Sequence, residues 1–165
     1  MFPEADALSN IVSDTVKTLF KRQLVDRVLR LPTEMAHGGR FPRRDQFEPS
    51  TLGADWASCL LIAVQSPVQL SHFVAVGNNL SVADCPNDTL AGVLLSHLPH
   101  VLSERRCLMI EGRATLRGLG VLYRSALFPL SEDGGAIDHV LGAANHRQLR
   151  ENEELMAPLI RTKWL

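Results

Sequence analysis

The side chains with the clearest capacity for chemistry are six histidines and three cysteines. His97 and His100 lie three residues apart in a segment that we expect to be helical, and one imidazole in an apolar pocket suffices to bind a haem iron. Pro99 interrupts the pair, however, and a surface or capping histidine is far commoner. We therefore leave the cofactor unknown and keep His97 or His100 as the candidate ligand of a haem.

Cys59, Cys85 and Cys107 form no CxxC pair, and their odd number argues against a disulfide framework. Two of them, Cys85 and Cys107, could in principle gather around zinc with His97 and His100. Their spacings match no closed structural zinc site, so we predict no metal site. Unpaired cysteines are typical of reduced thiols, which favours a cytoplasmic protein.

Residues that often carry catalysis stand here in unsuitable positions. The segment 118–120 (Gly-Leu-Gly) lacks the third glycine and the following helix of a phosphate-binding loop, and it is interpreted as a β-turn. Ser58 and Ser125 lie on predicted strands rather than in a nucleophile elbow. Asp133 and Asp138 lie on and after a turn, where solvation is the expected role. The sequence therefore predicts no catalytic residues and a protein that is not an enzyme.

The composition is that of an ordinary globular chain, with 165 residues of which 45% are hydrophobic and 21% charged. This length suits one domain that can bury a core without disulfides. A net charge of −1 favours neither nucleic acid nor an anionic membrane. The first residues lack the pattern of a signal peptide, and the apolar runs are too short to span a bilayer. We expect a soluble protein that binds neither nucleic acid nor membrane.

The first 39 residues are predicted to form a helical segment, in which Pro32 favours an end or a kink of the helix near Leu31. Apolar residues recur there at three- and four-residue steps, on a surface wide enough for two neighbours. In one interpretation the helix contacts the protein's own sheet and a second element, for which a partner chain is a candidate. In the other it is a single deeply buried helix, and the pattern leaves both open. The candidate residues of a dimer interface are Val12, Val16, Leu19, Phe20, Val25 and Leu29.

Five strands are predicted in the rest of the chain from alternating or continuous apolar runs between turn residues. They are Ser58–Gln65, His72–Gly77, Ile110–Arg117, Gly120–Leu130 and Ile137–Asn145. The first is apolar on both faces, which is typical of a central strand covered on both sides. In the third, Glu111, Arg113, Thr115 and Arg117 share one face. The tail from Gln148 is charged and is predicted to be helix-prone and peripheral.

Two helices are predicted between the second and third strands. Asp88 is a suitable N-cap for a helix over Thr89–Leu95, and Pro99 fits the first turn of another that runs to about Leu108. Short connections favour an antiparallel sheet, with these helices on one face and the N-terminal helix against the other. The fold class is therefore α+β, with a small apolar cavity expected between helices and sheet.

Four motifs in this order resemble the PAS domain, and more closely a bacterial, alphaproteobacterial-type PAS-like subfamily. They are Phe41-Pro42-Arg43-Arg44-Asp45-Gln46-Phe47-Glu48-Pro49, Phe73-Val74-Ala75-Val76-Gly77-Asn78, Thr89-Leu90-Ala91-Gly92 and Leu127-Phe128-Pro129-Leu130-Ser131-Glu132-Asp133-Gly134. The resemblance covers roughly residues 40–147. It divides the chain into an N-terminal helical segment (1–39), a PAS-like domain (40–147) and a C-terminal tail (148–165). Val74 departs from the pattern, because the subfamily often carries Arg there.

The resemblance implies a PAS-like five-stranded antiparallel sheet with a helical cover and an N-terminal flanking helix. It also implies signal reception or partner binding, dimerisation through the flanking helix, and a pocket that holds haem, flavin, a small metabolite or nothing. The candidate residues of a ligand pocket are Val74, Val76, Leu94, Leu98, Val101, Tyr123 and Ser125.

The expected function is that of a stand-alone sensory or regulatory domain that acts through protein–protein interaction, with a protein partner supplying the output in trans. A homodimer and a small apolar ligand are part of this expectation. One alternative is a small enzyme on the cone-shaped fold of ketosteroid-isomerase-like proteins, for which His72, His139 and Asp138 are the strand-borne candidates. The other alternative is a ligand-free structural adaptor.

Overall fold

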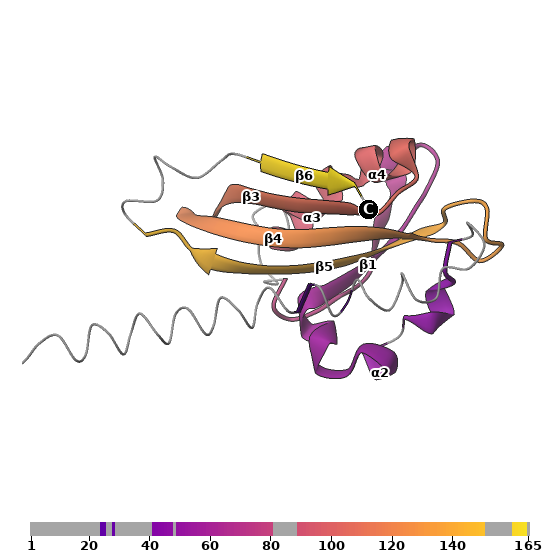
Figure 1. Ribbon diagram of the computed structural model, residues 1–165, viewed down its shortest axis with the longest axis horizontal. Helices are drawn as coiled ribbons and strands as arrows, with labels where there is room; N and C mark the ends of the chain where they lie inside the picture. The colour runs from indigo at the N-terminus through magenta and orange to yellow at the C-terminus, as the bar shows by residue number, and fades with distance from the viewer. Residues whose placement is uncertain are drawn as a thin grey trace, which may run out of the picture.

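The structure is a computed structural model, and it describes residues 24, 25, 28, 41–47, 49–80, 89–150 and 160–164. Its described part is built on an antiparallel sheet of six strands in the order β2-β1-β5-β4-β3-β6 (Figure 1). The strands are β1 (Cys59–Ala63), β2 (His72–Val76), β3 (Leu108–Leu116), β4 (Leu119–Leu130), β5 (His139–Gln148) and β6 (Ile160–Trp164). The predicted α+β class and five of these strands are therefore confirmed, with ends that differ by a few residues.

The strand β1 lies inside the sheet, between β2 and β5. All five of its residues are buried. Leu60 and Ile62 belong to the core on one face of the sheet, and Cys59 and Leu61 to the core on the other. A strand covered on both faces needs apolar side chains at every position, which explains the continuous apolar run.

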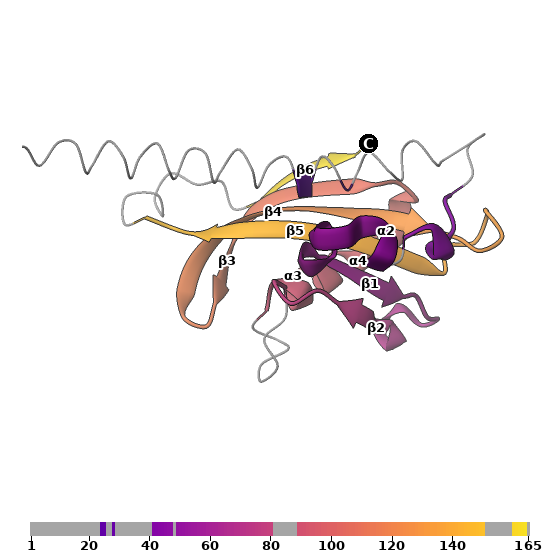
Figure 2. The ribbon, with the colours of Figure 1, turned by 90° about the horizontal axis from the view of Figure 1, so that it is seen from below.

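Two short helices between β2 and β3 cover one face of the sheet. They are α3 (Leu90–Ser96) and α4 (Leu98–Glu104), and Figure 2 shows both on the same side of the strands. The Oγ1 of Thr89 caps α3 by accepting a hydrogen bond from the Gly92 N–H at 3.2 Å. The helix thus begins one residue later than predicted, and Asp88 lies outside the described residues. Pro99 stands in the first turn of α4, as predicted.

Short helical turns cover the opposite face. They are the 3₁₀ helix η1 (Arg44–Gln46), α2 (Pro49–Leu52) and the 3₁₀ helix η2 (Gly53–Ser58). Phe47 follows η1 and Leu52 ends α2, and both are buried against Leu61 and Leu141 of the sheet. The same face buries two residues of the predicted N-terminal helix, Val25 and Val28, both in helical conformation. Apart from these two and Leu24, the predicted helix lies outside the described residues.

The predicted tail is corrected at its end. Residues Ile160–Trp164 form β6, which pairs antiparallel with β3 from Ile160 opposite Gly112 to Trp164 opposite Leu108. Ile, Thr and Trp favour strands, and β3 offers an open edge for pairing. Pairing with β3 therefore overrides the helix preference that the charged residues of the tail led us to expect.

The connection between β3 and β4 is a two-residue hairpin turn. Arg117 and Gly118 have φ angles of 53° and 75°, and Leu116 pairs with Leu119. Positive φ at both central residues is typical of the turns that match the twist of a hairpin. A turn is thus present at Gly118, but it is shifted from the predicted 118–120: Leu119 and Gly120 lie on β4, and Arg117 lies in the turn and not on the strand face predicted for it.

Candidate functional site

The predicted ligand-pocket residues are largely brought together under α3 and α4. Leu94, Leu98 and Val101 are almost completely buried, and they share one apolar core with Tyr123 of β4. Val76 is half-buried and packs against the same core. These side chains form the contact between the helical cover and the sheet, and an apolar cavity among them stays a prediction.

Ser125 lies in the same layer of the sheet and is fully buried. Its hydroxyl donates a hydrogen bond to the carbonyl oxygen of Ile110, across the β3–β4 ladder, at 3.3 Å. A buried hydroxyl needs such a partner, because leaving it unpaired costs about 1–3 kcal/mol. Tyr123, two residues earlier, is also buried, and this burial raises the pKa of its phenol.

Val74 does not belong to this layer. Its side chain is 41% exposed, whereas its neighbour Phe73 packs against the helical core. The pairing of β1 with β2 shifts between Leu61 and Ile62, so that Leu61 faces Ala75 and Ile62 faces Phe73, which leaves Val74 as the extra residue of a β-bulge. A bulge breaks strict alternation, and sequence reasoning that assumed alternation chose Val74 and missed Phe73.

The predicted dimer interface lies mostly outside the described residues. Val25 is the member that the structure describes, and it is completely buried against Cys107 and Ala126 of the same chain. Its side chain is therefore part of the protein's own core. Val12, Val16, Leu19, Phe20 and Leu29 lie outside the described residues.

The two candidate haem ligands differ in burial. His97 links α3 to α4 and is half-buried, and this burial, followed by the proximity of His100, lowers the pKa of its imidazole. His100 is exposed. Because an axial ligand must be a neutral imidazole in an apolar setting, His97 fits a haem better than His100 does. Within the described part of the chain, no group of three or more His, Cys, Asp and Glu side chains could hold a metal ion.

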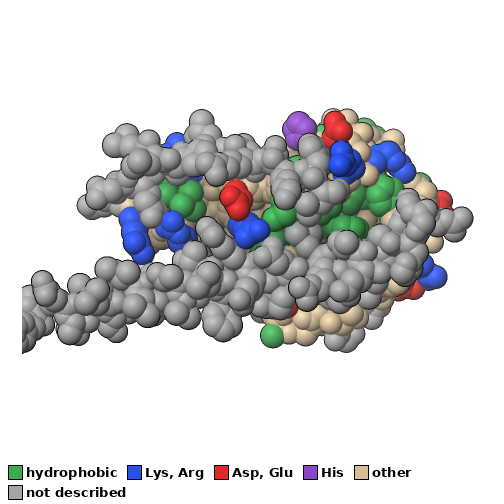
Figure 3. All heavy atoms as spheres, in the orientation of Figure 1, with side chains coloured by type: hydrophobic (Ala, Val, Ile, Leu, Met, Phe, Trp, Pro, Cys, Tyr) green, Lys and Arg blue, Asp and Glu red, His purple; other side chains and the backbone are tan. Residues whose placement is uncertain are grey.

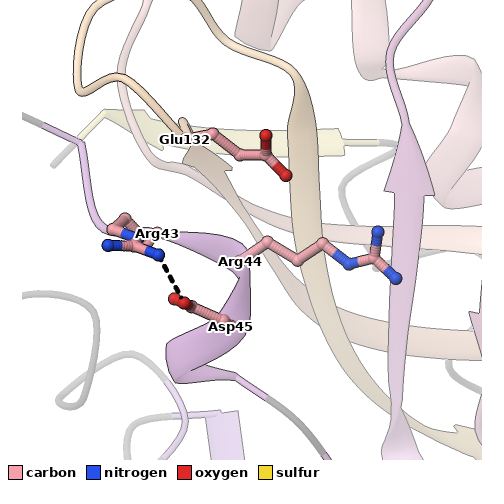
Figure 4. Close-up of a pocket in the computed structure, with 4 residues that line it drawn as sticks. All are labelled: Arg43, Arg44, Asp45 and Glu132. Carbon is pink, nitrogen blue, oxygen red and sulfur yellow. Dashed lines mark hydrogen bonds and ion pairs between the residues drawn. The ribbon is translucent and has the colours of Figure 1, made fainter.

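A polar hollow lies on a different part of the molecule, between η1 and the turn that joins β4 to β5. Its volume is about 490 Å³, and it is lined by Arg43, Arg44, Asp45 and Glu132 (Figure 4). Arg43 pairs with Asp45 at 2.6 Å. The guanidinium of Arg44 and the carboxylate of Glu132 both project to the same side, away from that pair. Sequence reasoning assigned Arg43 and Arg44 to the first PAS-like motif and did not identify this site.

Arg44 also begins a chain of polar contacts that leads to Asp138. Its Nη1 lies 3.4 Å from Nε2 of His139, and Nδ1 of His139 lies 2.7 Å from Oδ1 of Asp138. Arginine has no acceptor, so Nε2 accepts and the imidazole proton resides on Nδ1, from which it is donated to Asp138. The other carboxylate oxygen of Asp138 accepts the Glu132 N–H at 2.7 Å. His139 and Asp138 thus hold Arg44 and the backbone of Glu132 in place.

The β4–β5 turn is held by a second carboxylate. Oδ1 of Asp133 accepts the N–H groups of Gly135 at 2.7 Å and Ala136 at 2.9 Å, and the hydroxyl of Ser131 at 2.9 Å. These three bonds, with the Gly135 N–H first, lower the pKa of Asp133. Ser131 is also bonded through its N–H to the carbonyl of Pro42, which fixes the turn beside the start of η1.

The ionisable pair needed by the alternative enzyme is thus present, but not under the helices. Asp138 and His139 lie at the start of β5 beside the polar hollow, and His72 is exposed on β2. None of the three belongs to the apolar core between the helices and the sheet.

Cys59 and Cys107 are free thiols in the cores of the molecule. Burial raises the pKa of each to about 12, with an added contribution from Asp55 for Cys59. The thiol of Cys59 donates to the carbonyl of Asp55 at 3.2 Å. Such thiols are inert at neutral pH, because the thiolate is the nucleophile.

The face opposite α3 and α4 carries charges of both signs next to apolar side chains (Figure 3). Glu111 of β3 and Arg124 of β4 stand opposite each other in the ladder and pair at 3.4 Å. Among the described residues, none of the helices is both long and apolar enough to cross a membrane. Comparisons of the chain with known protein families, with curated proteins and with solved structures found no match.

Proposed function

We propose that the chain is a PAS-like regulatory domain that binds a partner protein and a small apolar ligand, with the output supplied in trans. The proposal includes a homodimer formed through the N-terminal segment and a cytoplasmic location. The observation that carries it is the helical insertion α3–α4 between β2 and β3, which covers one face of the sheet over its interior strands.

The first support is the position of β1. It lies between β2 and β5, so the first strand is interior to the sheet. An interior first strand favours the PAS-like arrangement over the cone-shaped fold. The helical insertion meets this sheet through apolar side chains, so helices and sheet are joined by contacts that carry little directional preference. A ligand that enters this layer would change the position of α3 and α4 relative to the sheet. It would act as a switch if it bound one position more tightly than the other.

The second support is the chemistry of the layer under the helices. Leu94, Leu98 and Val101 supply an apolar lining. Tyr123 and Ser125, two residues apart on the same face of β4, supply two hydroxyl groups, of which that of Ser125 already donates to the Ile110 carbonyl. Small-molecule sites are usually apolar with a few polar groups that fix orientation. This combination favours a small apolar ligand with one polar atom.

An enzyme on a cone-shaped fold is the weaker proposal. It requires an ionisable side chain aimed into the space between helices and sheet, with a shifted pKa. The candidate pair Asp138 and His139 instead holds Arg44 and the β4–β5 turn. An adaptor without a ligand differs from our proposal in one observable, which is the mass of the purified protein.

The experiment that tests the proposal is native mass spectrometry of the freshly purified chain, combined with an absorption spectrum. We expect a dimer that carries a bound molecule. In Leu98→Trp the larger side chain fills the buried layer, and the bound molecule should be lost. The matched control is Leu70→Trp, because Leu70 is 62% exposed; it should retain the molecule.

Three results would contradict the proposal. A monomer of unliganded mass would remove both the dimer and the ligand. A dimer without any bound molecule would favour the structural adaptor. A bound molecule that persists in Leu98→Trp would place the ligand elsewhere. A Soret band in the absorption spectrum would identify the ligand as haem and make His97 the first residue to substitute.

A further inference from the structure

The polar hollow beside η1 has no net charge, but only two of its four charged side chains form an ion pair with each other. Its lining contributes two positive and two negative side chains. One positive and one negative group, Arg43 and Asp45, neutralise each other at 2.6 Å. The remaining two are Arg44 and Glu132. They form no ion pair with each other in the described structure, and Figure 4 shows both side chains extending away from the Arg43–Asp45 pair.

The backbone that carries these two groups is well fixed. On one side, the Arg43 N–H donates to the Gln46 side chain at 2.9 Å, and the Phe47 N–H donates to the Arg44 carbonyl at 3.0 Å, which closes η1. On the other side, the Glu132 N–H is bonded to Asp138. Both charges are therefore presented by ordered turns, and little backbone entropy is lost when a ligand joins them.

The chemistry of the pair defines the ligand. A guanidinium binds a carboxylate through two parallel hydrogen bonds, and a carboxylate accepts from an ammonium. A purely anionic ligand would use Arg44 alone, and a purely cationic one would use Glu132 alone. A zwitterion with both groups close together satisfies both side chains and leaves the site neutral.

We propose that this hollow binds a free amino acid, with its carboxylate on Arg44 and its ammonium on Glu132. The volume of about 490 Å³ accommodates the side chain of the amino acid as well as its charged end. Because both protein groups are exposed, the affinity is modest and falls as salt is added. The site uses other residues than the apolar layer under α3 and α4, so it stands independently of the proposed function.

The test is titration of the full chain with each natural amino acid, in which binding is monitored by the NMR chemical shifts of the protein's backbone N–H groups. For an amino acid that binds, two blocked forms are compared, the amide, which has lost the carboxylate, and the N-acetyl derivative, which has lost the ammonium. Each blocked form should bind about tenfold more weakly or worse, equivalent to about 1.4 kcal/mol. The shifts should be largest at η1 and the β4–β5 turn.

Two substitutions extend the test. Arg44→Gln and Glu132→Gln should each weaken binding about tenfold, by the loss of one charged contact. Their matched controls are Arg106→Gln and Glu104→Gln, exposed residues of the same charge near the end of α4, and these should bind normally. Because Glu132 is exposed, its variant is expected to fold even if Arg44→Gln disturbs His139.

The proposal is overturned by any of three outcomes. The first is the absence of binding by every natural amino acid. The second is equal binding of the free and blocked forms, which would mean that the charged end is not recognised. The third is normal binding by Glu132→Gln in a protein whose melting temperature is unchanged.

Discussion

The guanidinium of Arg105 lies over the ring of Phe41, 5.3 Å from its centre. The same guanidinium donates a hydrogen bond to the carbonyl of Gly135. Arg105 is the C-cap of α4, so one side chain joins the end of the helical cover to the segment before η1 and to the β4–β5 turn. The Phe41 N–H in turn donates to the carbonyl of Gly134. The helical cover and the walls of the polar hollow are thus connected at one point.

Substitution of Arg105 by Ala should separate these three segments. We expect the free energy of unfolding to fall by about 1–2 kcal/mol, because an exposed cation–π contact contributes about 0.5–1 kcal/mol and the hydrogen bond a similar amount. Urea denaturation measures the loss, and amide hydrogen exchange at Phe41 should become faster. Arg106→Ala, at an exposed neighbour with the same side chain, is the control. Equal effects of the two substitutions would contradict the role given to Arg105.

Gly77 occupies a position where no side chain fits. A Cβ at this residue would overlap the backbone carbonyl groups of Trp56 and Ala57. We expect Gly77→Ala to lower the free energy of unfolding by about 3 kcal/mol, the upper end of the cost of overpacking, since the atoms it meets are backbone and cannot turn aside. The control is Gly135→Ala, whose Cβ would meet only an oxygen of Asp133 at 3.6 Å. A wild-type midpoint for Gly77→Ala in chemical denaturation would refute this account.

The strands β1 to β5 could be predicted because their apolar pattern and their turn residues agree. Leu60, Leu61 and Ile62 form a continuous apolar run that suits only a strand covered on both faces, and that is where β1 lies. The turn at Gly118 follows from the need for positive φ, which glycine meets without strain. Much of the apolar layer under α3 and α4 could also be predicted, because its residues follow an apolar pattern of this kind.

The polar site could not be predicted, because it depends on tertiary contacts between residues far apart in the chain. Arg44 and Glu132 are separated by most of the domain, and neither lies in an apolar pattern that would fix its direction. Phe73, and not Val74, packs against the helical core because of a β-bulge. The bulge adds one residue to β2 without a distinctive sequence pattern. The strand β6 forms because β3 has an edge to pair with, and the local residue preferences before it indicate a helix.

The two buried thiols should be unreactive in the folded protein. Burial raises the pKa of Cys59 and Cys107 to about 12, so at pH 8 neither supplies a thiolate. We expect iodoacetamide to leave both unlabelled in buffer and to label both in denaturant, as read by site-resolved mass spectrometry. Labelling of either residue in the native protein at the rate of a free peptide thiol would show that it is accessible.

The same thiols predict how stability depends on alkaline pH. Their pKa is higher in the folded state than the ordinary value of 9.0, so the folded state retains two protons that the unfolded state releases. The contribution of these thiols is therefore fully present below pH 9 and is lost as the pH rises from 9 towards 12. In Cys59→Ala/Cys107→Ala this fall with pH should be reduced, although the double variant is less stable at neutral pH. Identical slopes for the two proteins between pH 9 and 11 would contradict the assignment.

The carboxylate of Asp133 predicts an acid dependence of opposite sign. Its pKa lies below the ordinary value of 3.8, because the N–H groups of Gly135 and Ala136 and the hydroxyl of Ser131 bond to the ionised form. The folded state therefore holds fewer protons at this group than the unfolded state, and its contribution to stability is present above pH 3.8 and is lost as the pH falls through the lower folded pKa. Asp133→Ala should lower the melting temperature at neutral pH, and the difference from the wild type should shrink below pH 3.8. The control is Glu132→Ala, whose exposed carboxylate takes no part in the turn's hydrogen bonds. A difference between Asp133→Ala and the wild type that stays constant down to pH 2 would mean that the turn does not depend on the ionised carboxylate.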